Sequence, residues 1–227
     1  SPEAIAKQFG IPVYADFRNF DIARGGKGAP LIPLFHQFLL CDESKNKLIF
    51  NIGGIANGTY LKRMEIELAS DVGPGNCLMD EAMRNFGLGL FDKDGALARS
   101  GEINDAILKL FIKDLENLTY PRADDISIYM NVFKKYENEI LKLDPADALC
   151  TLTELTAIKI IEFIKTCDQT DELIFHGGGT ENKYLMNRIA ESVSTQVKLI
   201  DDIAPSKYIE AIAFAYLAFK ERAVLFR

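Results

Sequence analysis

Two glycines flanked by asparagines form the first segment of the chain that could bind phosphate. It reads Asn51-Ile-Gly-Gly-Ile-Ala-Asn57, and its glycines, Gly53 and Gly54, separate two apolar runs. Glycine has no Cβ atom, so backbone N–H groups at such a turn can approach an anion closely. A tight β-turn without a ligand is the alternative, and this segment alone leaves both interpretations open.

A second segment, Asp71-Val-Gly-Pro-Gly-Asn76, adds a carboxylate to the same kind of turn. We expect it at the end of a strand and the start of a helix, with its amides facing outward and the positive helix terminus behind them. Asp71 could then accept a proton from a nucleophile or hold a metal-bound water. An Asp turn followed by Asn76 as the helix cap is the structural alternative.

A third segment, Phe175-His-Gly-Gly-Gly-Thr-Glu-Asn182, carries three consecutive glycines. The order of strand, glycine run and helix lets a nucleotide base and ribose lie against the backbone. The spacing differs from the G-x-G-x-x-G pattern of dinucleotide sites, and the chain has no Walker A sequence. A P-loop kinase is therefore disfavoured.

The histidines and cysteines point to structural roles. His36 lies in an apolar stretch and His176 precedes the glycine run, and neither is near a serine or cysteine in a nucleophile setting. We expect both rings to be packed or hydrogen-bonded, and a hydrolase triad has no support. The four cysteines are isolated and complete no zinc set, which predicts reduced thiols and gives no metal ligand.

Hydrophobic periodicity predicts the elements that position these turns. Strands are expected at 11–15, 48–52, 55–62, 64–69, 173–175 and 197–200. Helices are expected at 2–9, 31–40, 76–86, 102–116, 129–142, 147–166, 181–191 and 205–222. The glycine-rich stretch 16–30 is expected to be a loop. This order indicates an α/β layer fold whose mixed sheet starts with a hairpin and three antiparallel strands, flanked by helices.

Composition excludes several classes of partner. The 227 residues include 26 Lys and Arg against 33 Asp and Glu, for a net charge of -7, and the cationic residues are scattered. A nucleic-acid backbone needs a basic stripe, so nucleic acid is not expected as a partner. No apolar run approaches the roughly 20 residues of a membrane helix, and the first ten residues do not read as a signal peptide. We therefore expect a cytoplasmic protein that does not bind a membrane.

Taken together, the segments closely resemble one family, anhydro-N-acetylmuramic acid kinase, of the superfamily that includes actin, Hsp70 and hexokinase. The resemblance covers nearly the whole chain in the family's order and spacing. The matching stretches are 16–31, 51–57, 71–76, 91–95, 177–186 and 210–218. The resemblance implies an actin-like ATPase (ribonuclease H-like) lobe at 41–227, preceded at 1–40 by the remainder of the sugar-binding, N-terminal lobe.

The resemblance further implies an ATP- and Mg²⁺-dependent sugar kinase of cell-wall (peptidoglycan) recycling, and a homodimer. Such an enzyme hydrolytically opens the ring of 1,6-anhydro-N-acetylmuramic acid and phosphorylates O6, giving N-acetylmuramic acid 6-phosphate. Asp71 would be the general base that activates water, and Arg18, Asp21 and Glu210 would belong to the sugar side. The residues implied to bind ATP are Gly53, Gly54, Asn57, Gly73, Gly75, Asn76, Gly177, Gly178, Gly179 and Asn182.

The chain departs from the family pattern in three places. Lys27 replaces the usual glutamine of the glycine loop, and Pro121-Arg-Ala-Asp-Asp-Ile-Ser127 stands where the family tends to carry a basic segment with glycine. The family's N-terminal Gly-Thr-Ser-x-Asp-Gly phosphate loop is not in these residues. Because an actin-like kinase closes two lobes around ATP, we expect this fragment to be inactive alone. A degenerate nucleotide-binding module and a filament-forming actin relative are the alternatives.

Overall fold

A mixed β-sheet lies at the centre of the molecule. The computed structural model describes residues 1–26, 28 and 30–226, and Lys27 therefore lies outside the described residues. The central strands are β2 (Asn46–Ile52), β3 (Ile55–Lys62), β4 (Glu65–Pro74), β5 (Glu172–His176) and β6 (Val197–Leu199). Their order is β4-β3-β2-β5-β6; β2, β3 and β4 pair antiparallel, whereas β5 and β6 run parallel to β2. The expected mixed sheet with three leading antiparallel strands is confirmed.

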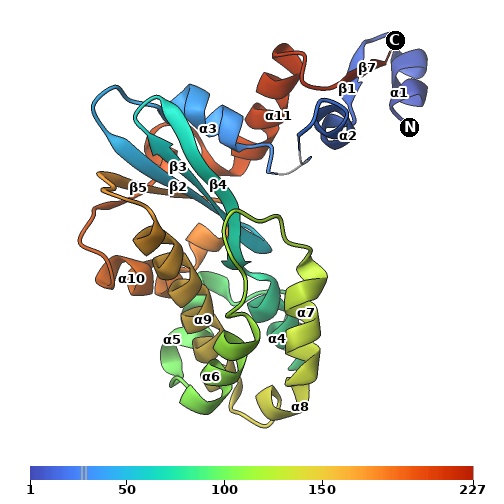
Figure 1. Ribbon diagram of the computed structural model, residues 1–227. Helices are drawn as coiled ribbons and strands as arrows, with labels where there is room; N and C mark the ends of the chain where they lie inside the picture. The colour runs from blue at the N-terminus through green and yellow to red at the C-terminus, as the bar shows by residue number, and fades with distance from the viewer. Residues whose placement is uncertain (27, 29, 227) are drawn as a thin grey trace.

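Helices cover both faces of this sheet (Figure 1). On one face, Phe50 of β2 packs with Phe163 of α9 (Pro145–Thr166) and with α10 (Lys183–Glu191). On the other face, Ile49 packs with α3 (Pro33–Leu40) and α11 (Ile209–Phe219). Successive side chains of a strand point to opposite faces, so the apolar run of β2 supplies both cores at once.

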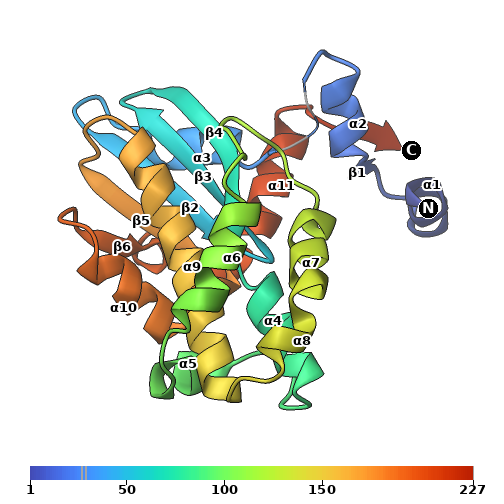
Figure 2. The same ribbon diagram turned by 60° about the horizontal axis from the view of Figure 1, so that its bottom comes forward.

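A second group of helices forms its own core beside the carboxyl end of β4 (Figure 2). Its members are α4 (Cys77–Asn85), α5 (Ala96–Ser100), α6 (Asp105–Asp114), α7 (Ile126–Lys135) and α8 (Glu137–Ile140). They pack against the first half of α9, which therefore joins this core to the sheet. Helix α5 was not expected, and the single helix expected at 129–142 is wrong because the chain breaks at Tyr136 between α7 and α8.

The two ends of the described chain meet in a small unit beside the sheet (Figure 1). It contains α1 (Pro2–Phe9), β1 (Val13–Ala15), α2 (Phe17–Ile22) and β7 (Val224–Phe226), and β1 pairs antiparallel with β7. The expectations of a loop throughout 16–30 and of a helix as far as residue 222 are therefore wrong. Two strands that pair across more than 200 residues of sequence leave no local sequence pattern that predicts the pairing.

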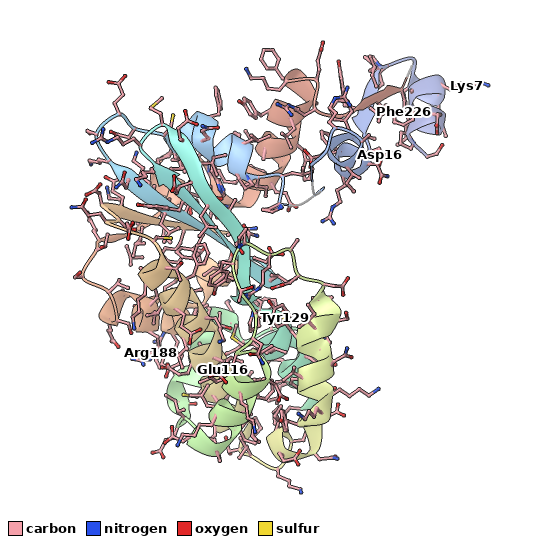
Figure 3. The ribbon with its side chains drawn as sticks, in the orientation of Figure 1. Lys7, Asp16, Glu116, Tyr129, Arg188 and Phe226 are labelled. Carbon is pink, nitrogen blue, oxygen red and sulfur yellow. The ribbon has the colours of Figure 1, made fainter. Side chains whose placement is uncertain are left out.

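Packing also assigns α3 to the sheet, because its Phe35 and Leu40 share a core with α11. The sequence-based division at residue 40, with 1–40 as the remainder of the N-terminal lobe, stays a prediction. Short 3₁₀ turns complete the described structure at Lys93–Gly95, Gly178–Glu181, Ile200–Asp202 and Ser206–Tyr208. Arg188 of α10 (Figure 3) joins this helix to α9, donating from Nε and Nη2 to Glu154 at 2.8 and 2.9 Å.

The two histidines form a buried pair between α3 and the sheet. His36 Nε2 lies 2.9 Å from His176 Nε2, and His36 Nδ1 lies 2.9 Å from Thr59 Oγ1. Both rings are buried, which confirms the expected packed and hydrogen-bonded role. Burial lowers the pKa of His176 to about 4, and burial together with the neighbouring His176 lowers the pKa of His36 well below its usual value.

This pair predicts that the protein loses stability in mild acid. In the unfolded chain each imidazole titrates near about 6.5, so between that pH and about 4 the unfolded state binds protons that the folded state excludes. The contribution of the buried pair to the free energy of unfolding is therefore fully present above about pH 6.5. It falls as the pH drops, by up to about 1.4 kcal/mol per pH unit per histidine. Urea unfolding between pH 4.5 and 7.5 measures this slope.

The variant His176→Gln supplies the comparison. It removes one of the two titrating rings, so its free energy of unfolding should fall less steeply with acid than that of the unaltered chain. Parallel slopes for the two proteins would contradict the assignment of this pH dependence to the histidine pair.

Candidate active site

Three adjoining cavities run along the carboxyl ends of the central strands. The Asp71 cavity, of about 670 Å³, is bordered by Gly53, Asp71 and Glu210 among others. The glycine cavity, of about 570 Å³, is bordered by Gly53, Gly178 and Glu210. The Phe91 cavity, of about 360 Å³, is bordered by Phe91 and Gly178. Neighbouring cavities share lining residues, so the glycine turns and Asp71 border a row of three adjoining cavities, called the cleft below.

The hairpin tip at Gly53 and Gly54 is held by the end of β4. Asn76 N donates to Gly53 O at 2.8 Å, and Gly75 N donates to Gly54 O at 2.9 Å. The expectation that the amides of the Asp71–Asn76 segment face outward is therefore wrong for these two groups. They fix the position of the tip, and the tip itself borders the Asp71 cavity.

The two glycines of the Asp71–Asn76 segment make room for other parts of the protein. A Cβ atom on Gly75 would lie 2.2 Å from Gly53 O, and one on Gly73 would lie 2.8 Å from Lys159 Cβ. Neither glycine borders the three cavities, whereas Asn76 borders the Phe91 cavity. The absence of side chains at Gly73 and Gly75 thus serves close packing of the strand.

Asp71 lies within β4, not at its end, and Asn57 of β3 is its cross-strand partner. Its Oδ2 accepts a hydrogen bond from Asp124 N at 2.7 Å, and its own N donates to Arg122 O at 3.0 Å. Burial raises the pKa of Asp71 above its usual value; the Asp124 amide acts in the opposite direction, and so do the charges of Arg122 and Arg18. A carboxylate with a raised pKa is better suited to accept a proton near neutral pH.

The residues expected on the sugar side divide into two groups. Arg18 of α2 and Glu210 of α11 both border the Asp71 cavity. Asp21 does not: its Oδ2 accepts a hydrogen bond from Gly28 N at 2.8 Å, and Gly28 itself borders the cavity. Asp21 therefore shapes the glycine loop.

The glycine run continues the cleft beyond the hairpin. Gly177 has a φ of +91° and donates to Ser206 Oγ at 3.1 Å; a Cβ atom there would lie 2.3 Å from Asn51 Oδ1. A Cβ on Gly178 would meet Asn76 Nδ2 at 4.0 Å, an ordinary contact, and Gly178 borders both the glycine and the Phe91 cavities; a Cβ on Gly179 would lie 2.2 Å from the Ile52 side chain. Asn182 borders the Phe91 cavity and caps α10 by accepting from Leu185 N at 2.9 Å.

Sequence reasoning missed several lining residues. Asn51 borders two of the cavities, and Phe91 is an exposed ring at the end of the cleft; both stand in the matching stretches but were given no role. Asp124 and Asp125 border the Asp71 cavity. The only signal for them was that 121–127 departs from the family pattern.

In the described part of the chain, none of the helices combines the length and the apolar character needed to cross a bilayer. Its His, Cys, Asp and Glu side chains form no group of three or more arranged to hold a metal ion. Its four cysteines are free thiols, as expected.

Comparison with known proteins gives a family match. The model of the family described as anhydro-N-acetylmuramic acid kinase matches residues 1–225. Curated proteins of that name are similar to the chain: that of Gamma-proteobacterium EBAC31A08 is 37% identical over 223 residues, and that of Shewanella amazonensis is 39% identical over 228. The alignments cover 96% of this chain but 60% and 61% of those relatives, so the chain spans about 60% of their length.

A solved structure agrees on the fold. The activator of 2-hydroxyisocaproyl-CoA dehydratase from Clostridium difficile, with bound ADPNP, aligns with a TM-score of 0.53 at 13% identity. The alignment covers 82% of this chain and 63% of the activator. The fold of the chain is thus that of an actin-like ATPase, as expected from the sequence.

The contact between Gly75 and the hairpin predicts the effect of a single methyl group. Gly75→Ala places a Cβ against the backbone oxygen of Gly53, which cannot rotate away, so the free energy of unfolding should fall by about 2 kcal/mol or more. Gly54→Ala is the matched control, because its Cβ would meet the Ile126 side chain at an ordinary 3.5 Å. Urea denaturation compares the two variants, and equal losses would contradict the packing role of Gly75.

Proposed function

The chain belongs to the anhydro-N-acetylmuramic acid kinase family, and we propose on this basis that the protein is an ATP-dependent sugar kinase. Its substrate would be 1,6-anhydro-N-acetylmuramic acid, whose ring it opens by hydrolysis while phosphorylating O6 to give N-acetylmuramic acid 6-phosphate. The observation that carries this proposal is that Asp71 and the Gly53–Gly54 turn border the same cavity, which adjoins the cavity at the glycine run. A base, a water molecule and a phosphoryl group can meet there.

The chemistry assigned to Asp71 is general base catalysis. Asp71 accepts a proton from a water molecule as the water oxygen attacks the anomeric carbon, and the bond between that carbon and O6 breaks. O6 then bonds to the γ-phosphorus of ATP, and the bond from that phosphorus to the β–γ bridging oxygen breaks to release ADP. The raised pKa of Asp71, caused chiefly by burial, favours the proton transfer.

ATP would lie along the rest of the cleft. We assign its phosphates to the hairpin tip at Gly53 and Gly54, which borders both the Asp71 and the glycine cavities. Its adenosine would lie by the glycine run, where Gly178 borders two cavities and a Cβ atom would make no close contact. The sugar would occupy the Asp71 cavity, beside Arg18 and Glu210.

Mg²⁺ is part of the same proposal. Kinases usually hold this ion by one or two carboxylates together with phosphate oxygens and water. Carboxylates from separate elements border the Asp71 cavity, and within the described residues no three or more His, Cys, Asp or Glu side chains form a group that could hold a metal, so phosphate oxygens and water would have to supply the remaining ligands. Asp125 and Glu210 are the side chains that would hold the ion, which neutralises phosphate charge when bound.

A degenerate nucleotide-binding module is the second candidate. The observation that favours it is the acidic 124–125 pair beside Asp71, in the segment where the sequence departs from the family. In that case the complete protein would bind ATP without phosphorylating the sugar. A cytoplasmic location and a homodimer stay predictions from the family resemblance.

Asp71→Asn tests the kinase proposal in the complete protein. Loss of the base should reduce turnover of anhydro-N-acetylmuramic acid by about 10²–10⁴-fold. Affinity for ATP should change little, because the phosphate and adenosine ends of the cleft keep their lining. A coupled assay for ADP release measures turnover, and calorimetry measures ATP binding.

Asp114→Asn is the control, since Asp114 pairs with Lys135 on the surface, outside the cleft. Wild-type turnover in Asp71→Asn would remove the base assignment. ATP binding by the unaltered protein without any sugar phosphorylation would favour the degenerate module.

A further inference from the structure

The residues that follow Tyr120 run along the outer edge of β4, beside Asp71. Asp71 N donates to Arg122 O at 3.0 Å, and Arg122 N donates to Ser70 Oγ at 2.9 Å. Asp124 N then donates to Asp71 Oδ2 at 2.7 Å. Backbone groups of this segment therefore contact Asp71 on both its main chain and its side chain.

The side chains of the segment turn toward one another. The Asp124 carboxylate is only 3% exposed and accepts a hydrogen bond from Arg122 Nε at 2.7 Å. It also accepts from the hydroxyl of Tyr129, a fully buried residue of α7 (Figure 3). Arg122 is fixed in turn, because its guanidinium donates to Leu118 O at 3.0 Å and to Val72 O.

Such a buried carboxylate requires these donors. Burial of an unpaired charge costs several kcal/mol, whereas a charge that is paired and hydrogen-bonded holds its neighbours in one arrangement. Arg122 bridges Asp124 to the backbone of β4, the strand that carries Asp71. The network therefore sets where the Asp124 amide stands relative to the Asp71 carboxylate.

We propose that Arg122, Asp124 and Tyr129 are positioning residues, which together form a clamp that orients the Asp71 carboxylate for water activation. This inference rests on the proposed function. The clamp holds Oδ2 of Asp71 on the Asp124 amide. Oδ1 has no hydrogen-bond partner among the side chains and amides that the structure describes, so it is the oxygen left to accept the proton from water.

Other charges around Asp71 must be included in any test. Arg122 and Arg18 act to lower its pKa, the Asp124 carboxylate acts to raise it, and Asp125 and Glu210 border the same cavity. Arg122→Gln is the informative variant, because it removes a positive charge and also loosens the Asp124 amide. Both changes raise the pKa of Asp71. Asp124→Asn is less informative, since its two effects oppose each other.

The first experiment follows the Asp71 carboxyl carbon by ¹³C NMR through a pH titration of the complete protein. The signal is assigned by its loss in Asp71→Asn. Arg122→Gln should move the titration midpoint upward by about one pH unit. Tyr129→Phe keeps every charge and should give a smaller upward shift, and Arg84→Gln, which removes an exposed charge on α4, should give none.

The second experiment measures the pH profile of kcat/KM. The acidic limb should shift in the same direction as the NMR midpoint, and at its optimum Tyr129→Phe should lose about tenfold in kcat with the sugar KM changed less than about twofold. Thermal unfolding verifies that each variant is folded. An unmoved midpoint in folded Arg122→Gln, or a loss confined to KM, overturns the clamp. Absence of turnover in the unaltered protein would contradict the proposed function. The NMR titration would still test whether the clamp controls the pKa of Asp71.

Discussion

The cleft depends on one close backbone contact, between the carboxyl end of β4 and the tip of the β2–β3 hairpin. The amides of Gly75 and Asn76 donate to the carbonyls of Gly54 and Gly53, and no side chain at Gly75 could fit between them. This contact ties the hairpin tip to the segment that leads into α4. As a result, Asp71 in β4 and the tip border the same cavity, and Asn76 borders the far end of the cleft.

The two aspartates beside this contact have different surroundings. Asp124 has two side-chain donors, Arg122 and Tyr129, whereas the Asp71 side chain receives one backbone amide. A fully paired buried carboxylate holds its surroundings in place, and a partly paired one keeps an oxygen for chemistry. Asp71 and Asp124 are the same residue type, so their different roles follow from their different hydrogen-bond partners.

Periodicity predicted the central sheet well, because apolar runs such as β2 and β5 are buried on both faces and carry a strong local signal. Glycine was harder to interpret. At Gly178, which borders the cleft, a Cβ atom would meet only an ordinary contact at 4.0 Å, whereas at Gly75 the missing side chain admits another backbone. The sequence cannot separate these cases, since both depend on what folding brings nearby. Asp124 of the clamp showed no local sequence pattern. Its partners Arg122 and Tyr129 are brought to it only by folding, when the segment contacts β4.

The pairing of β1 with β7 has a consequence for the chemistry of the cleft. It joins the small unit to the end of α11, and the rings of Phe17 and Phe214 meet with centroids 4.9 Å apart. Through these contacts Arg18 of α2 reaches the Asp71 cavity, where its charge acts to lower the pKa of Asp71. Burial remains the largest influence on the pKa of Asp71, and the β1–β7 sheet, formed by residues far apart in the sequence, adds to it the smaller, opposing effect of the Arg18 charge.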